Sequence, residues 1–161
     1  LIREKAKGFI QKAFTIIFAA TLIVWFLQNF DAGLHLVTST DQSLLAQIGS
    51  LVAPLFAPLG FGDWRVSTAL ITGFMAKESV VSTLTVLLGG KTALLTTLFT
   101  PFTAYVFLIF TLLYTPCVAA VATVRREMGT VRTAAGIALL QCVTAWIVAF
   151  IVHGIGMLFG L

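Results

Sequence analysis

The sequence predicts an all-α membrane protein, a bundle of about four to five transmembrane or re-entrant helices, some of them broken. Two features of composition point to the membrane: 59% of the 161 residues are hydrophobic, and only 10% are charged. Soluble domains carry about 25% charged residues, so a soluble fold of this size would lack the polar side chains that cover a surface. A third feature, prolines and glycines inside the apolar runs, predicts the breaks.

The chain opens with a basic amphipathic segment, residues 1–12. Its apolar positions recur on one helical face, and its Arg and Lys residues lie mostly elsewhere. Such a helix lies at a membrane interface, and the positive-inside rule places it on the cytoplasmic side. Because the first residue is Leu1 rather than Met, we expect the sequence to be cut from something longer.

Three uncharged or nearly uncharged runs are long enough to be full membrane spans. A spanning helix needs about 20 apolar residues to cross the hydrocarbon core. A polar stretch at residues 31–41 follows the first run and is predicted to be a loop. We expect the three spans at residues 13–30, 101–124 and 133–161.

Charge counting favours a re-entrant hairpin between the first two spans. If residues 66–88 crossed the membrane completely, the cluster Arg125, Arg126 and Arg132 would fall outside, against the positive-inside rule. If residues 66–88 instead enter and leave on one side, the cluster falls inside. Residues 42–62, which Pro54 and Pro58 interrupt, could make the same hairpin or lie on the interface.

Several function classes are excluded or disfavoured by the sequence. A GxxxxGK[ST] phosphate loop is absent, so the chain binds no nucleotide by that route. The net charge of +4 comes from short clusters between apolar runs, which indicates lipid headgroups rather than nucleic acid. Cys117 and Cys142 both lie in apolar segments and have neither disulfide nor zinc spacing. No nucleophile has a base nearby in sequence, so we do not expect this chain to be an enzyme.

The segment Gly-Phe-Met-Ala-Lys-Glu-Ser at residues 73–79 places charges in an apolar run. A charge at mid-membrane costs roughly 3 kcal/mol or more, so it is usually retained for a function. Helical spacing puts Met75, Glu78 and Ser82 on one face, which would offer a thioether, a carboxylate and a hydroxyl. Lys77 would partner another helix or extend to the interface. The alternative is that Lys77 or Glu78 merely joins helices through an ion pair.

A second break is predicted at Tyr-Thr-Pro-Cys, residues 114–117. Pro116 cannot donate a backbone hydrogen bond, which frees the carbonyl of Leu112. Inside a membrane, a free carbonyl is tolerated only within protein or beside a watery cavity. The thiol of Cys117 beside such a break could meet a soft or borderline metal ion. The alternative is a proline kink with a small apolar cysteine packed against it.

These motifs together resemble the C-terminal membrane part of the bacterial ferrous iron transporter family FeoB. The resemblance covers nearly the whole chain in order and is carried by residues 4–10, 58–65, 73–84 and 114–120. The last two stretches are the most specific. The chain looks like the second of the family's two Gate regions, at about residues 13–124, with C-terminal helices at about residues 101–161 in a membrane domain of residues 13–161.

The resemblance implies multi-pass membrane transport of Fe²⁺ across the bacterial cytoplasmic (inner) membrane. The family's Thr-Pro-Cys cysteine is a proposed iron-pathway ligand and matches Cys117, and its Ala-Lys-Glu motif includes Glu78; both are expected to bind Fe²⁺ transiently. No tightly bound cofactor is expected. The full set of expected pathway residues is Cys117, Glu78, Lys77, Met75, Ser82 and Pro116.

The resemblance also implies partners. The family couples its membrane part to an N-terminal GTP-binding domain, and that domain and the first Gate region are not in this sequence. We expect contacts with lipids and with the missing N-terminal half, and a homo-oligomer or a small cytoplasmic Feo protein as further partners. Two other functions stay open: a Gate-type carrier half for an organic solute such as a nucleoside, and a structural membrane subunit.

Overall fold

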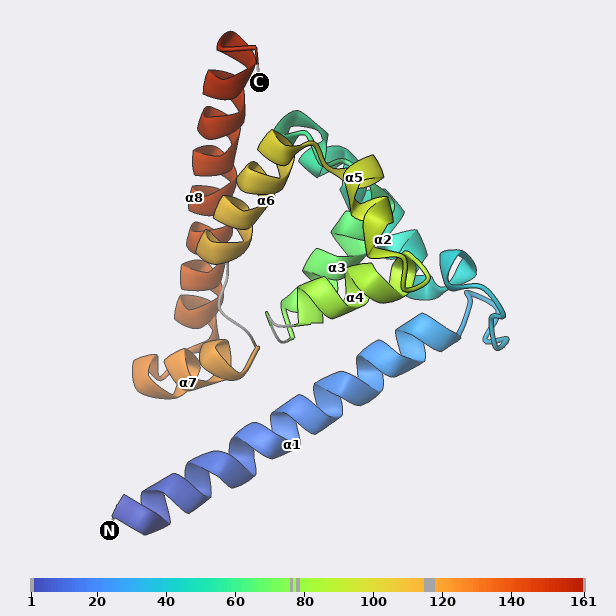
Figure 1. The fold of residues 1–161 in the computed structure, drawn as a ribbon. Coiled ribbons are helices and arrows are strands. Elements are labelled where there is room, and N and C mark those ends of the chain that lie inside the picture. Colours follow the sequence, from blue (N-terminus) through green and yellow to red (C-terminus); the bar gives the residue numbers. More distant parts are fainter. Residues whose placement is uncertain (1, 76, 78, 115–117, 161) are drawn as a thin grey trace.

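The computed structural model describes residues 2–75, 77, 79–114 and 118–160, and in these residues it contains eight α-helices and no extended sheet (Figure 1). The one β-bridge in the described residues joins Phe30 to Leu36 at the ends of the loop after the first helix. The all-α class with broken helices is therefore confirmed.

Helix α1 spans Ile2–Asn29 and extends away from the remaining helices, with the N-terminus at its far end (Figure 1). At 1.5 Å per residue its 28 residues reach about 42 Å. Large apolar side chains such as Phe18, Leu22 and Trp25 are exposed along it, as expected of a helix that contacts lipid. The amphipathic segment and the first expected span are thus one continuous helix, and the division of the chain at residue 12 stays a prediction.

A bent helix pair follows the loop. Helix α2, Leu44–Phe56, continues as a 3-10 turn, Ala57–Leu59, and then turns by 102° into α3, Trp64–Gly73. The turn is built by Gly60, whose φ of 85° suits glycine, and by Asp63, whose carboxylate accepts the Arg65 backbone N–H at 2.7 Å. This geometry fits a broken span or a re-entrant loop. The expected interruption at Pro54 is wrong, because α2 runs through that proline.

Two expected continuous runs are each divided into two helices. Residues 66–88 form the end of α3 and then α4, Ser79–Leu87, and residues 101–124 form α6, Pro101–Leu113, and the start of α7, Val118–Met128. The prediction of one full span at 101–124 is wrong. Pro116 explains the division, since proline disfavours helical geometry in the residue before it and cannot donate to the preceding turn.

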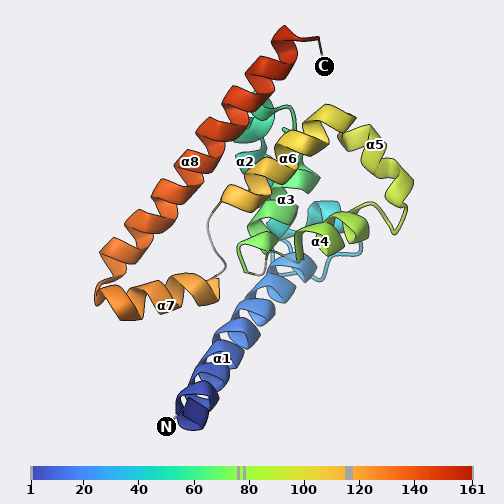
Figure 2. The same cartoon turned by 60° about the vertical axis from the view of Figure 1, so that its left-hand side comes forward.

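Helix α8, Val131–Leu158, packs beside α6, and the end of α7 leads into the first turn of α8 (Figure 2). Within the described residues, one helix, α8, is long and apolar enough to cross a membrane. If the bent pair α2–α3 is counted as a single span, the number of possible spans is two. The short helices Thr92–Leu94 and α5, Leu95–Leu98, connect α4 to α6. The expected span at 13–30 lies within α1 and stays a prediction.

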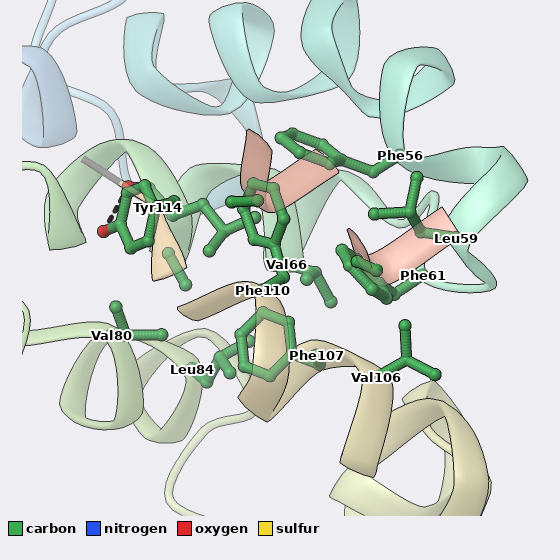
Figure 3. Packing of buried hydrophobic residues seen from close by; sticks show 14 residues of the cluster. Phe56, Leu59, Phe61, Val66, Val80, Leu84, Val106, Phe107, Phe110 and Tyr114 are labelled. Carbon is green, nitrogen blue, oxygen red and sulfur yellow. Dashed lines mark hydrogen bonds between the residues drawn. The ribbon is translucent and has the colours of Figure 1, made fainter. Parts of the chain in front are cut away.

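The core lies where α2, α3, α4, α6 and α8 meet (Figure 3). Aromatic rings fill its centre: Phe61 lies edge-on to Phe107 at 5.3 Å, and Phe110 stacks on Tyr114 at 5.5 Å. Small residues of α8, Ala145 among them, are fully buried and allow α6 to approach closely. Tyr114 thus ties the end of α6 into the core.

Trp146 of α8 holds the end of α2. Its indole Nε1 donates to the Leu55 carbonyl oxygen at 3.0 Å. Trp146→Phe keeps the aromatic stack on Phe150 but removes this bond, so we expect a loss of about 1 kcal/mol of stability. Thermal unfolding in detergent measures it. Trp25→Phe, on the exposed part of α1, is the control, and equal melting temperatures in both variants would contradict the role of the bond.

Candidate transport site

The two breaks predicted from the sequence lie against each other. The first is between α3 and α4, and the second is between α6 and α7. The backbone N–H of Val118 donates to the Phe74 carbonyl oxygen at 3.0 Å, and this bond joins the start of α7 to the end of α3. The Tyr114 hydroxyl donates to the Leu70 carbonyl oxygen at 3.3 Å (Figure 3). Segments about 40 residues apart in sequence therefore form one site.

Lys77 connects the two breaks through its ammonium group. Its Nζ donates to the Tyr114 carbonyl oxygen at 2.9 Å and to the Leu112 carbonyl oxygen at 3.3 Å. It also lies 5.0 Å from the centre of the Tyr114 ring, where a cation is attracted by the ring face. The Leu112 carbonyl is the one that Pro116 was expected to free. Of the two roles expected for Lys77, the structure shows the contact with another helix.

A positive charge suits this end of α6. The last carbonyls of a helix have no intrahelical donor, and the helix dipole places partial negative charge there. The ammonium of Lys77 satisfies two of these carbonyls at once. The break between α6 and α7 therefore exposes backbone oxygens that favour a cation, and Lys77 is the cation that binds them.

Gly73 lies where three helices converge. A Cβ at this position would meet the side chain of Val80 on α4 and the hydroxyl of Tyr114 after α6. Next to it, the Thr72 hydroxyl of α3 and the Thr83 hydroxyl of α4 are 3.0 Å apart, and both side chains are buried. The close approach of α3 and α4 depends on the absence of a side chain at residue 73.

A cavity of about 180 Å³ lies between α1 and the α3–α4 break. Met75 and Ser82 both line it, although the expectation that one helical face carries them is wrong: α3 ends at Gly73 and α4 begins at Ser79. Tertiary packing, not helical spacing, brings the two together. The sequence interpretation missed its other polar lining residues, which are Thr21, Gln28, Thr72, Ser79 and Thr83. Thr21 and Gln28 of α1 are seven residues apart and therefore share a helical face, but nothing in the sequence predicted that this face would lie across a cavity from α4.

Three of the expected pathway residues, Glu78, Pro116 and Cys117, lie outside the described residues. Their proposed role in binding iron stays a prediction. Among the residues that the structure does describe, no three His, Cys, Asp or Glu side chains gather closely enough to hold a metal ion.

The remaining polar groups occupy other regions. In the loop after α1, the Asp31 carboxylate accepts the backbone N–H groups of His35 at 2.9 Å and Gly33 at 2.8 Å. These bonds, that of His35 first, lower the pKa of Asp31. Cys142 of α8 lines a cavity of about 520 Å³ with an almost wholly apolar wall. The His153 ring stacks on Phe102 at 6.1 Å, on the far side of the core from the break.

The chain matches a protein-family model, Gate, described as nucleoside recognition, over residues 10–131. This is more than half of the chain. The chain belongs to the Gate family. No solved structure matches it.

Curated relatives of this Gate chain carry the name Fe(2+) transporter FeoB. The protein of Staphylococcus aureus strain MSSA476 is 40% identical over 97% of the chain, and that of Methanocaldococcus jannaschii is 35% identical over 95%. The Campylobacter jejuni protein is 34% identical over 94%. The alignments cover 24%, 24% and 27% of these relatives, so the chain spans about a quarter of their length. The resemblance to FeoB drawn from the motifs is confirmed.

Proposed function

We propose that this Gate chain is the membrane permeation part of an Fe²⁺ uptake transporter in the bacterial inner membrane. The observation that carries the proposal is the pair of helix breaks joined by Lys77. Broken helices that meet near mid-membrane are the usual architecture of a transport site. The relatives named as Fe(2+) transporters supply the identity of that ion.

The proposed ligands suit an ion that must be released again. A transport site has to bind strongly enough for entry and weakly enough for exit. The Cys117 thiol and the Glu78 carboxylate would bind Fe²⁺ transiently, since borderline metals accept both sulfur and oxygen. Met75 and Ser82, which line the cavity beside the break, would offer a thioether and a hydroxyl on the way. Lys77 and Pro116 would shape the break rather than bind the ion.

The chain would act as part of a larger protein. We propose an N-terminal GTP-binding domain and a first Gate region as its intramolecular partners, with lipids around it and a homo-oligomer as its assembly. A small Feo partner protein is supported by a Porphyromonas gingivalis relative, 29% identical, that is named as a fusion of Fe(2+) transport protein A and FeoB. GTP would act only through the N-terminal domain.

The nucleoside alternative receives support from the description of the family model alone. A nucleoside needs several hydrogen-bonding side chains around it. The cavity of about 520 Å³, which has room for an organic solute, is lined by side chains such as Leu55, Phe56, Ile71 and Val143. Its apolar wall disfavours a nucleoside, whereas the smaller cavity beside the break is lined in part by hydroxyl and amide side chains, which suit a hydrated ion.

The proposal predicts that Cys117→Ser and Glu78→Ala each lower iron uptake. The loss should be at least about tenfold, because even indirect supports of a metal ligand are worth 10–100-fold in affinity. Uptake of radioactive Fe²⁺ by cells that make the full-length protein measures it, with membrane expression checked in parallel.

Cys142→Ser is the matched control, since this cysteine lies on α8 beside the apolar cavity. Its uptake should equal that of the parent. Parental uptake in both site variants at normal expression would contradict the site, and uridine uptake without Fe²⁺ uptake would favour the nucleoside carrier.

A further inference from the structure

Two neighbouring cavities lie along α1 and α4. The first, of about 180 Å³, begins at Met75 beside the helix break. The second, of about 360 Å³, reaches Asn29 at the end of α1 and Thr40 beyond the loop. Gln28, Ser82 and Thr83 line both. The two cavities therefore follow each other from the break toward the loop at residues 31–41.

The hydroxyl groups along this path are arranged as acceptors. Thr21 donates its proton to the Ile17 carbonyl oxygen at 2.8 Å, and Ser82 donates to the Ser79 carbonyl oxygen at 3.1 Å. A hydroxyl has one proton and two lone pairs, so a hydroxyl that donates to backbone keeps only acceptor capacity for the cavity. Thr72 follows the same pattern, because it donates to the Ala69 carbonyl oxygen at 2.9 Å.

The amide at the outer end offers both kinds of group. One side-chain N–H of Asn29 donates to the Trp25 carbonyl oxygen at 2.7 Å, which leaves its Oδ1 as an acceptor and its second N–H as a donor. The described side chains that line the two cavities are all uncharged. Water molecules bound to a cation point their hydrogens outward, so the acceptor hydroxyls of this uncharged wall suit a hydrated cation.

The dimensions also favour water and an ion. A buried water needs about 10–15 Å³, so the first cavity has room for several. Pockets that hold drug-sized organic molecules measure about 300–1,000 Å³, which is larger than this cavity.

One face of helix α1 lines this path. It consists of Ile17, Ala20, Thr21, Val24 and Gln28, which recur every three to four residues. Leu22 follows Thr21 directly, but it lies about 100° around the helix from it and does not line the cavity. Polar side chains at membrane depth are stabilised when they line a water-filled cavity.

We propose that the two cavities form a water-filled vestibule that conducts a hydrated divalent cation between the loop side and the helix break. The identity of the cation as Fe²⁺ rests on the proposed function, whereas the vestibule itself rests on the lining residues. By the positive-inside prediction the loop side is outside, so the vestibule is the entry path. Its neutral wall keeps the cation hydrated until it reaches the break.

Cysteine accessibility tests this proposal in the full-length protein. Thr21→Cys and Leu22→Cys form a matched pair, because adjacent residues lie at nearly the same depth but on different faces. A membrane-impermeant trimethylammonium methanethiosulfonate, added outside intact cells, should modify Thr21→Cys at least about tenfold faster. A thiol in hydrocarbon stays protonated, and each unit of raised pKa removes about tenfold of the reactive thiolate. Modification of the parent, with its native cysteines, is subtracted.

Gln28→Cys, nearer the loop, should react faster than Thr21→Cys, and Fe²⁺ added under anaerobic conditions should slow both reactions. Equal rates for Thr21→Cys and Leu22→Cys would overturn the vestibule. Faster reaction of Thr21→Cys than of Gln28→Cys would overturn its opening on the loop side. Protection by uridine but not by divalent cations would contradict the proposal that the vestibule conducts a divalent cation. Rapid modification in a protein that takes up no iron would leave the vestibule standing and count against the proposed function alone.

Discussion

Lys77→Met is expected to disconnect the two helix breaks and to abolish iron uptake. The substitution keeps an unbranched side chain of similar length but removes the ammonium from the Leu112 and Tyr114 carbonyl oxygens. An unsatisfied buried acceptor costs about 1–3 kcal/mol, and this cost applies to the carbonyl of the buried Tyr114, whereas Leu112 is exposed. The contact with the Tyr114 ring is lost as well. The expected result is a lower melting temperature in detergent together with loss of uptake.

Two further variants make this test specific. Lys77→Arg keeps the charge, but its planar fork cannot place one nitrogen between the two oxygens, so we expect partial function. Lys91→Met, on the exposed turn after α4, removes a lysine that lies outside the site and should behave like the parent. An unchanged melting temperature and uptake in Lys77→Met would show that the ammonium does not hold the breaks together.

The double substitution of Lys77 and Glu78 by alanine separates transport from a structural role. If the chain were only a structural membrane subunit, the assembled complex should tolerate both losses. If the breaks form the transport site, uptake should fall even when expression is normal. The double variant therefore distinguishes the permeation proposal from the structural alternative.

The local chemistry of the two breaks could be predicted from the sequence, because each break depends on a few neighbouring residues. Pro116 lacks an N–H, so a freed carbonyl at Leu112 follows from covalent structure alone. The cost of an intramembrane charge likewise predicted that Lys77 would either contact another helix or extend to the interface. That these two unsatisfied groups are each other's partners could not be predicted, since 35 residues separate them and only tertiary packing brings them together.

Helical periodicity gave wrong results where it was extended through a break. Periodicity predicted that Met75 and Ser82 lie on one face of one helix, yet α3 ends at Gly73 and Ser82 belongs to α4. The two side chains still line one cavity, whose other side is formed by residues of α1. Thr21 and Gln28 were missed for the same reason: on an apolar helix, single polar residues have no distinctive pattern until the neighbouring helix is known.

Hydrophobicity predicted which segments meet lipid but not where each helix stops. Residues 101–124 are uncharged throughout and mostly apolar, so their composition alone indicates a single span. The structure divides them at Tyr114, whose ψ of 169° is extended and ends α6. The aromatic core fixes this residue.

Gly73→Ala should disrupt the site from its most crowded point. The new methyl group would meet Val80 of α4 and the hydroxyl of Tyr114, so α3 and α4 must separate or Tyr114 must move. Overpacking of this kind costs about 1–3 kcal/mol. Movement of Tyr114 would also break its bond to the Leu70 carbonyl oxygen and displace the carbonyl that binds Lys77. We expect a lower melting temperature and reduced iron uptake.

Gly136→Ala on α8 is the matched control, because a Cβ there meets nothing within 4 Å. Alanine is favoured over glycine inside a helix by up to about 1 kcal/mol, so this variant should be neutral or slightly stabilised. Val80→Ala creates space next to residue 73, so the double variant Gly73→Ala, Val80→Ala should lose less stability than the sum of its single variants. Additive losses would mean that the methyl group at residue 73 does not act through Val80. The close approach of α3 and α4 at Gly73 would then not be what stabilises the break.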